Sequence, residues 1–468
     1  MHVGAGVYYT NIIIDQLANS KGGVGKAPGI TSIPTAYSLY AANGAVTPPL
    51  NPTNGVGSAT ATIPANLLNW NPPPAQVLPA SGASSFVCGD GIKPNPSPCS
   101  ILFTPPDLPS PRVYGWNLGI EHSFSSNLSV KANYVGNHGT RLPGLINVNQ
   151  LNPNSPAEIA CGHCESPTDL PYFSSFPYLF GITELTDSDI SYYNGLQLSL
   201  STRTFHNLAF NAGYTYSHAL SDLQGGDFHS TVAQNSLNPL GDYGAAQFDI
   251  RHHFGLTLTY NIPGMKSPGQ MLEGWILSSA IVIQSGLPWD AVDTANDPSR
   301  TGQFVDRWDF FGNHSDFKAG PNPIPFYQAG APSMPAACTQ AFNSSGGLAT
   351  LADGCYAVGN SVLIAPAPGQ FGTMSKNMFY DSGYHNWDLS VFKNWTFKER
   401  LTAQFRAEFF NILNLKNYAN PNLVSGSSDP SSTGQFGCAC ETPDVANTNP
   451  ALGSGAAREI QLGLKLLF

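Results

Sequence analysis

Apolar and polar side chains alternate most strictly in the stretch 386–413. Its second arm places one set of residues on one side, Leu401, Ala403, Phe405, Ala407 and Phe409, and the intervening set on the other, Thr402, Gln404, Arg406 and Glu408. Side chains of a β-strand point alternately to opposite faces, so this arm is predicted to be a strand with one apolar and one polar face. The first arm alternates in the same way, and a polar turn at Lys398 and Glu399 joins the two into a hairpin.

Such alternation fits two kinds of protein. In a soluble β-sandwich the apolar face would point to the core, whereas in a membrane β-barrel it would point to lipid and the polar face to a wet lumen. Arg406 and Glu408 share the polar face in a chain of which only 11% is charged. This favours the barrel and predicts that Gln404, Arg406 and Glu408 face its lumen.

Ten strands are predicted in all, at residues 2–9, 112–124, 127–136, 191–203, 206–217, 248–261, 273–285, 384–395, 399–413 and 457–468. The connections between them alternate strictly between long and short. The long ones cover residues 10–111, 137–190, 218–247, 286–383 and 416–456, and the short ones cover 125–126, 204–205, 262–272 and 396–398. An up-and-down barrel in an outer membrane has short periplasmic turns and long external loops. Residues 1–468 are therefore predicted to form a single antiparallel, up-and-down transmembrane β-barrel region.

Composition and net charge further reduce the classes of protein that fit this sequence. The chain has 468 residues, of which 47 are glycine and 39 proline, as is typical of many short strands separated by long loops. The formal net charge of −10 argues against nucleic-acid binding, which needs a basic face. The longest apolar run, residues 275–283, is far shorter than the roughly 20 residues of a membrane helix, so a membrane protein of this sequence has to be a barrel. The N-terminus lacks an export signal, which predicts a piece of a longer chain.

Eight cysteines form four local pairs within the long connections, Cys88 and Cys99, Cys161 and Cys164, Cys338 and Cys355, and Cys438 and Cys440. Close pairs in even number predict disulfides that stiffen external loops in an oxidising compartment, and their connectivity is left open. A disulfide closed within the Cys438-Ala-Cys440 segment would be strained. A second hypothesis is that Cys161, Cys164, Cys438 and Cys440 together bind zinc.

Known catalytic motifs find little support in the sequence. Cys161-Gly-His-Cys164 has the spacing of thiol oxidoreductases, but it is predicted to lie in a loop and not at the start of a helix after a strand. Residues 21–26 (KGGVGK) lack the spacing of a phosphate-binding loop. We therefore predict neither an enzyme nor a cofactor.

The last predicted strand, EIQLGLKLLF, ends in Phe468. An aromatic residue at the end of a final amphipathic strand is a recurrent feature of outer-membrane proteins. We therefore expect Phe468 to be an assembly signal for the barrel-assembly machinery, in the outer membrane of a Gram-negative-type bacterium.

Several stretches resemble the TonB-dependent outer-membrane transporters, in particular the Oar-like β-barrel group. They are found at residues 112–142, 192–222, 248–263, 274–289, 365–379, 386–395, 406–421 and 458–468, in the order of that family. The resemblance implies the C-terminal part of a plugged barrel of about 22 strands, of which this chain supplies about ten. It also implies contact with outer-membrane lipid, uptake of a bulky unidentified substrate, and coupling to the TonB system through an N-terminal part that the chain lacks.

The sequence is also compatible with two other kinds of protein. The first is a non-transporting surface barrel, an adhesin or scaffold with disulfide-stiffened external loops. The second, which the alternation favours less, is a secreted soluble β-protein.

Overall fold

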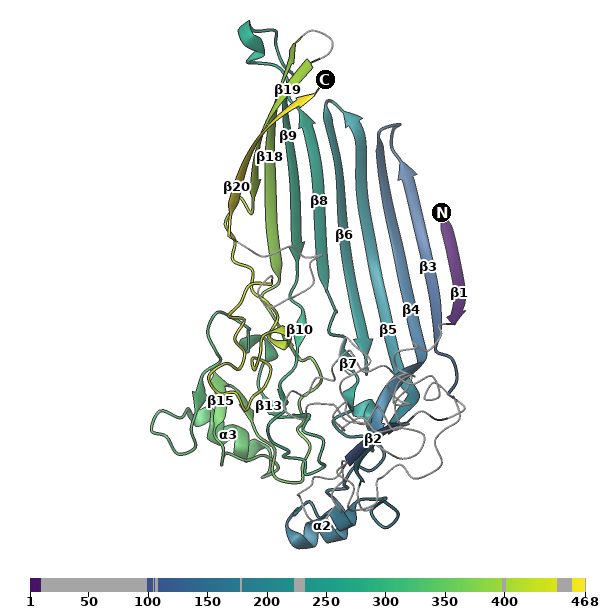
Figure 1. Cartoon of the computed structure of the whole chain (residues 1–468), viewed down its shortest axis with the longest axis vertical. Coiled ribbons are helices and arrows are strands. Elements are labelled where there is room, and N and C mark those ends of the chain that lie inside the picture. Colours follow the sequence, from purple (N-terminus) through teal and green to yellow (C-terminus); the bar gives the residue numbers. More distant parts are fainter. Residues whose placement is uncertain are drawn as a thin grey trace, which may run out of the picture.

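The computed structural model describes residues 1–9, 99–103, 105, 108–176, 179–222, 232–397, 401–443 and 457–467. Ten strands form the main path of one antiparallel sheet, in the order β1-β3-β4-β5-β6-β8-β9-β18-β19-β20 (Figure 1). Each strand pairs with the next strand of this path along the chain, which is an up-and-down arrangement. Within the described residues, β1 and β20 are the two end strands of the path, so the barrel is not closed.

The bounds of the main strands are β1 His2–Tyr9, β3 Arg112–Ser123, β4 Leu128–Asn147, β5 Leu179–Phe205, β6 Leu208–Ser221, β8 His252–Asn261, β9 Trp275–Gln284, β18 Tyr384–Phe397, β19 Leu401–Phe410 and β20 Glu459–Leu467. They coincide in number and order with the ten predicted strands. The predicted fold class, an antiparallel transmembrane β-barrel with only part of its strands present, is confirmed.

Some predicted strand boundaries were wrong. β4 continues to Asn147 and β5 begins at Leu179, because the segment 142–147 pairs with residues 183–189 beyond the end predicted for both strands. β8 begins at His252 and not at residue 248. The four residues before it are held by Asp249, which is fully buried, accepts a hydrogen bond from the Ala219 backbone N–H (2.7 Å) and forms an ion pair with Arg251 (2.9 Å).

Figure 1 shows the predicted sorting of the connections. The short turns, among them residues 124–127 and 206–207, lie at the upper end of the sheet, and the described parts of the long connections lie at the lower end. We call residues 148–176, 232–251, 285–383 and 411–443 the cap.

The cap is folded, whereas the sequence predicted only long loops. Its strands are short: β7 Gly244–Ala245, β10 Pro288–Trp289, β11 Val292–Asp293, β12 Asp306–Arg307, β13 Asp309–Phe311, β14 Phe326–Tyr327, β15 Cys355–Val358, β16 Ser361–Ile364 and β17 Phe379–Tyr380. β13, β16, β15 and β14 form a four-stranded sheet, whereas β7 and the parallel strand β2 (Cys99–Phe103) extend the main sheet. Trp289, Phe317, Tyr356, Phe379 and Phe436 are fully buried at the centre of the cap.

Helices are few. They are α2 Pro156–Cys161, α3 Ala336–Ser344 and the 3-10 turns η3 Pro167–Asp169, η4 Pro239–Asp242, η5 Pro268–Gln270, η6 His314–Asp316 and η8 Pro421–Leu423. The Ser155 hydroxyl caps α2 by accepting a hydrogen bond from the Glu158 N–H (3.1 Å), and Gly162 ends it at φ 74°. No helix among the described residues is long and apolar enough to cross a membrane.

Candidate functional site

The polar face of the sheet carries the three residues predicted to face the lumen. In the register of β18, β19 and β20, Gln404 lies between Asn394 and Lys465, and Glu408 lies between Ser390 and Gln461. Gln404 donates to Asn394 Oδ1 (2.9 Å), and the Arg406 Nε–H donates to Gln404 Oε1 (2.6 Å). The three residues therefore share one face of the sheet with a chain of polar partners; that this face is the lumen stays a prediction.

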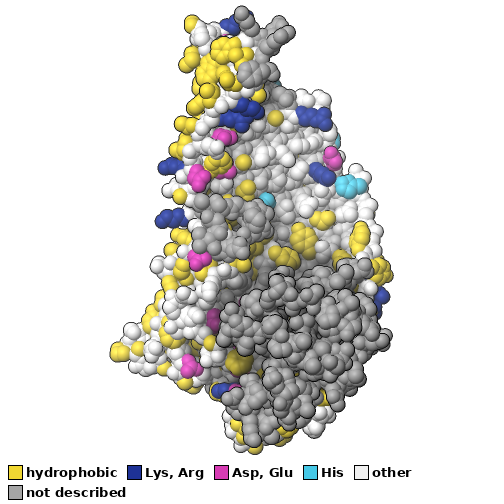
Figure 2. All heavy atoms as spheres, viewed as in Figure 1, with side chains coloured by type: hydrophobic (Ala, Val, Ile, Leu, Met, Phe, Trp, Pro, Cys, Tyr) yellow, Lys and Arg dark blue, Asp and Glu magenta, His cyan; other side chains and the backbone are white. Residues whose placement is uncertain are grey.

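Arg406 has one partner that alternation alone did not predict. Phe392, opposite Arg406 in the register, lies on the polar face, and the guanidinium carbon is 5.3 Å from its ring centre. An arginine over an aromatic ring is held in place while its charge remains available to solvent. The face of the sheet seen in Figure 2 is mostly free of hydrophobic atoms, with scattered charged groups over the strands.

The opposite face carries the exposed apolar side chains. Leu462 is 66% and Leu464 71% exposed, and they pair with Ala407 and Phe405 of β19. The register continues this face across the sheet to Leu198, Leu118 and Val3, which are also exposed. Exposed apolar side chains that recur on strands across one face of a sheet are expected where that face contacts lipid.

One buried cation interrupts this apolar face near the short-turn end. Lys393 lies opposite Phe405 and is only 1% exposed. Its ammonium donates to the backbone carbonyls of Gln270 (2.6 Å), Asn394 (3.1 Å) and Glu273, and lies 4.9 Å from the Trp395 ring centre. A lysine whose charge reaches turn carbonyls beside tryptophans is typical of a membrane interface.

A buried charge cluster lies where the cap meets the loop end of the sheet. Arg307 of β12 binds Asp242 and lies 3.8 Å from Asp290, and its Nε–H donates to the Met374 carbonyl (3.1 Å). Lys376 is 4% exposed and packs against β7, which Asn377 also contacts by donating to the Ala245 carbonyl (2.7 Å). The cluster therefore joins the cap to the extension of β6.

Burial shifts the pKa values of the charged groups in and beside this cluster. Burial raises the pKa of Asp290 and lowers that of Lys376. Burial alone would lower the pKa of Arg307, but Asp290 and Asp242 hold it above its ordinary value. Asp189 lies in the part of β5 beyond the end of β6, outside the membrane-spanning part, and burial together with the charge of Asp222 raises its pKa to about 7.

The described cysteine side chains are paired with their sequence neighbours. Disulfides join Cys161 to Cys164, Cys338 to Cys355, and Cys438 to Cys440. Cys88 and Phe468 lie outside the described residues, and Cys99 is described only by its backbone in β2. With these bonds, none of the sulfurs of Cys161, Cys164, Cys438 and Cys440 is a thiolate, so the hypothesis of a four-sulfur zinc site does not fit the structure.

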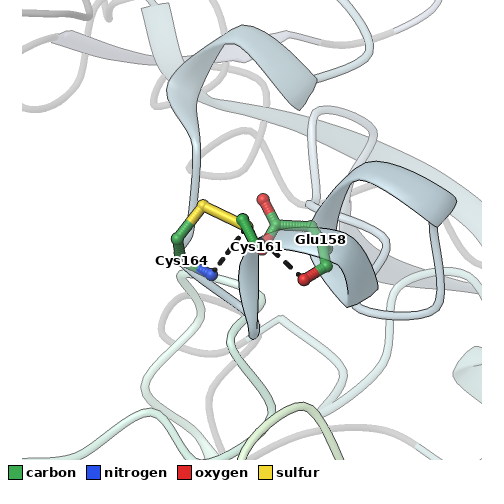
Figure 3. A group of neighbouring side chains, drawn as sticks. All are labelled: Glu158, Cys161 and Cys164. Carbon is green, nitrogen blue, oxygen red and sulfur yellow. Dashed lines mark hydrogen bonds between the residues drawn. A yellow bond between two sulfur atoms is a disulfide. The ribbon is translucent and has the colours of Figure 1, made fainter.

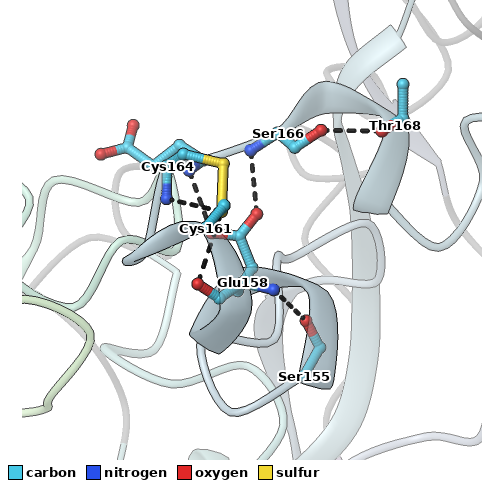
Figure 4. The surroundings of a disulfide bond; sticks show 7 residues. Ser155, Glu158, Cys161, Cys164, Ser166 and Thr168 are labelled. Carbon is cyan, nitrogen blue, oxygen red and sulfur yellow. Dashed lines mark hydrogen bonds between the residues drawn. A yellow bond between two sulfur atoms is a disulfide. The ribbon is translucent and has the colours of Figure 1, made fainter.

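Glu158 organises the Cys161–Cys164 turn (Figure 3). Its carboxylate is fully buried and accepts hydrogen bonds from the N–H groups of Glu165 (3.0 Å) and Ser166 (2.9 Å) (Figure 4). One oxygen of Glu158 lies within 4.8 Å of both sulfurs, a spacing that would suit a metal. Because the sulfurs are bonded to each other and the carboxylate is saturated by N–H donors, the group is a rigid turn.

The charge cluster is the feature that the sequence did not reveal. Its members come from β5, η4, β12 and two loops, and they are far apart along the chain. The scarcity of charge in this sequence is the only signal that could have drawn attention to them.

Comparison with known families decides the class of the protein. The family described as "Outer membrane beta barrel domain" matches residues 2–461. This chain belongs to that family. The protein is accordingly located in the outer membrane, and the family description names a barrel and no catalytic activity. No curated protein matches the sequence.

The solved structures that match this chain share little of its sequence. The outer-membrane transporter YddB from Escherichia coli is 11% identical with a TM-score of 0.33, and the match covers 79% of this chain and 34% of that one. FpvA of P. aeruginosa, solved with bound pyoverdine, is 10% identical with a TM-score of 0.31, covering 67% and 24%. The Pseudomonas putida toluene transporter TodX is 9% identical with a TM-score of 0.18, covering 65% and 56%. This chain therefore spans about a third of YddB.

Proposed function

We propose that this chain is part of the barrel of a TonB-dependent outer-membrane transporter that takes up a bulky substrate. In this proposal the polar face with Gln404, Arg406 and Glu408 lines the plug or the transit path. The cap captures the substrate at the external surface. The energy for import comes from the TonB system through a plug and a TonB-binding segment in an N-terminal part of a longer protein.

One observation carries the proposal: the polar face leads to a folded cap at the loop end. The Arg406–Gln404–Asn394 chain of hydrogen bonds crosses two strands on that face. The cap has an aromatic core of its own, in which the Trp289 and Phe379 ring centres are 4.9 Å apart. A rigid external surface above a polar path supports capture followed by passage.

Retention on TonB tests the proposal directly. The native protein is extracted from outer membranes in detergent, its intact mass is measured, and it is passed over the immobilised periplasmic domain of TonB from the same bacterium. We expect retention and a mass roughly twice that of the present chain, because a plugged barrel has about 22 strands. A protein of 49.7 kDa that is not retained would contradict the proposal.

A non-transporting surface barrel is the second candidate. The Cys338–Cys355 disulfide, which closes 17 residues within the folded cap, favours it because adhesins and scaffolds need stiff external surfaces. Failure of TonB retention, together with undiminished surface display of the cap, would favour this function.

A further inference from the structure

The connection between β11 and β12 gathers buried oxygen atoms. β11 and β12 are antiparallel, and their register places Asp293 directly opposite Asp306. A third carboxylate, Asp297, lies in the connection and is 7% exposed, whereas Asp306 is fully buried. Like charges opposite each other in a β-ladder are destabilising, so three carboxylates in so small a buried volume need an explanation.

Two hydroxyl groups complete the arrangement. Ser299 and Thr301 are buried, and their hydroxyl oxygens are 2.9 Å apart. The Ser299 hydroxyl is 3.0 Å from Asp297 Oδ1, and the Ser299 N–H donates to Asp306 Oδ2 (2.8 Å). Side-chain oxygens of four residues therefore converge around Ser299.

The three carboxylates differ in the hydrogen bonds that their oxygens accept. Asp297 accepts hydrogen bonds from the N–H groups of Thr301 (3.3 Å) and Gly302 (2.5 Å), and Asp293 accepts one from the Trp308 indole (3.1 Å). Asp306 Oδ1 is buried and has no hydrogen-bond partner within the described part of the chain. The carboxyl group of Asp306 faces that of Asp297.

The neighbouring arginine side chains form ion pairs with other carboxylates. Arg307 binds Asp242 and approaches Asp290, and the Arg300 guanidinium forms an ion pair with Glu165 at 2.5 Å. The unsatisfied oxygen of Asp306 faces a second carboxylate and accepts no hydrogen bond from an arginine of the described residues, although the positive charge of Arg307 acts on Asp306. A buried carboxylate in this position needs a proton or a bound cation.

We propose that Asp297, Ser299, Thr301 and Asp306 form a binding site for a hard divalent cation, with Ca²⁺ as the best fit. All four side chains offer oxygen, the ligand type that Ca²⁺ takes, and Ca²⁺ accepts six to eight oxygens in flexible geometry. Spacings of about 3 Å between ligand oxygens suit an ion bound at roughly 2.4 Å. Backbone carbonyls and water complete the coordination.

A cation at this position braces the cap above the sheet. Gly302 has φ 77°, and a Cβ atom there would lie 2.5 Å from the Phe180 ring of β5. The same connection is held to another part of the cap, because the Gly369 N–H donates to the Pro298 carbonyl (2.7 Å). Cation binding therefore stabilises a loop that contacts both the sheet and the cap.

Terbium luminescence tests the site in the full-length protein purified in detergent. Tb³⁺ replaces Ca²⁺ in oxygen sites, and Trp308, two residues after Asp306, is placed to sensitise its emission. We expect the wild type to show sensitised emission that Ca²⁺ displaces and Mg²⁺ displaces poorly. Asp306→Asn should lose this emission, and the matched control Asp353→Asn, at an exposed position, should retain it.

Thermal unfolding separates the cation from a shared proton. The side-chain amide introduced by Asp306→Asn can donate to Asp297, so the variant is expected to fold and its Tm to be the same in Ca²⁺ and in chelator. The wild-type Tm should rise with Ca²⁺ concentration, because a ligand of the folded state stabilises it. Emission equal in Asp306→Asn and wild type, or a wild-type Tm that Ca²⁺ does not change, would overturn the proposal and leave a proton between the two carboxylates. Neither readout depends on transport.

Discussion

The sheet and the cap of this protein are built on opposite principles. In the sheet, strand residues such as Leu462 and Leu464 expose their apolar side chains, and the polar side chains line the other face. In the cap, Trp289, Phe379 and Tyr356 are fully buried within one aromatic cluster. The cap resembles a small soluble domain with its own core, whereas the sheet has its apolar surface outside.

The difference indicates where each region obtains its stability. Burial of an aromatic side chain stabilises the cap by several kcal/mol, and this contribution is present in water. The apolar face of the sheet gains the corresponding free energy only when lipid covers it. Substitutions should therefore separate the two regions, because the same chemical change has different effects in each.

The largest effect is expected in the cap core. Phe379→Ala removes a fully buried ring that contacts Trp289, Phe310 and Phe317, at a cost of about 3–5 kcal/mol. Limited proteolysis of intact cells should then cleave the cap, while heat-modifiable migration still reports an assembled barrel. Leu348→Ala, at an exposed position, is the control. Loss of the barrel along with the cap would mean that the two regions do not fold separately.

Arginine substitutions on the apolar face of the sheet should instead impair assembly of the barrel. Phe405→Arg and Leu462→Arg each place a charge on the lipid-facing side, at a cost of roughly 2–4 kcal/mol near the midplane and less toward the interface. Both should reduce the amount of protein assembled in outer-membrane fractions, Phe405→Arg by less because Phe405 lies opposite Lys393. Gln404→Arg, one residue away on the other face, should be tolerated. If all three variants assembled equally well, the assignment of the faces would be incorrect.

Removal of a cap disulfide should have an intermediate effect confined to the cap. The Cys338–Cys355 bond closes 17 residues, and its loss through the Cys338→Ala, Cys355→Ala double substitution should cost about 3 kcal/mol on chain-entropy grounds. The Cys161–Cys164 bond closes only three, so its removal should cost less. Thermal unfolding of both variants under non-reducing conditions gives the comparison, and an equal loss of stability for the two would contradict it.

The smallest expected effect is a pH dependence at the junction of the two regions. Because the pKa of Asp189 is raised to about 7 in the folded protein, its contribution to stability is fully present below about pH 4 and is lost as the pH rises to 7. The slope cannot exceed about 1.4 kcal/mol per pH unit, and the lowered pKa of Lys376 opposes it. Unfolding of the wild type and Asp189→Asn at pH 5 and pH 7.5 measures it; an unchanged pH dependence in the variant would refute the assignment.

The sequence predicted the sheet better than the cap for a physical reason. Alternation with a period of two is a local property, so residues such as Leu401 to Phe409 were placed in the correct strand without any tertiary information. The extension of β4 to Asn147 lacks such alternation, so its pairing with β5 could not be predicted from the local pattern.

The cap depends on contacts between distant residues. The fully buried Tyr356 packs against Phe436, and Arg307 meets Asp242, across separations that no local pattern reports. The polar site residues Gln404, Arg406 and Glu408 were predictable because alternation placed them on one face. The buried charges were not predictable, because each of them alone has the sequence surroundings of an ordinary loop residue.

A spin-label scan along β20 tests the central claim, that the apolar face contacts lipid and the polar face water. Single labels at Gln461, Leu462, Leu464 and Lys465 of the membrane-inserted protein are compared for collision with oxygen, which concentrates in lipid, and with a water-soluble nickel chelate. We predict high oxygen and low nickel accessibility at Leu462 and Leu464 and the reverse at Gln461 and Lys465. Uniform accessibility along the strand, or alternation in the opposite phase, would contradict the claim.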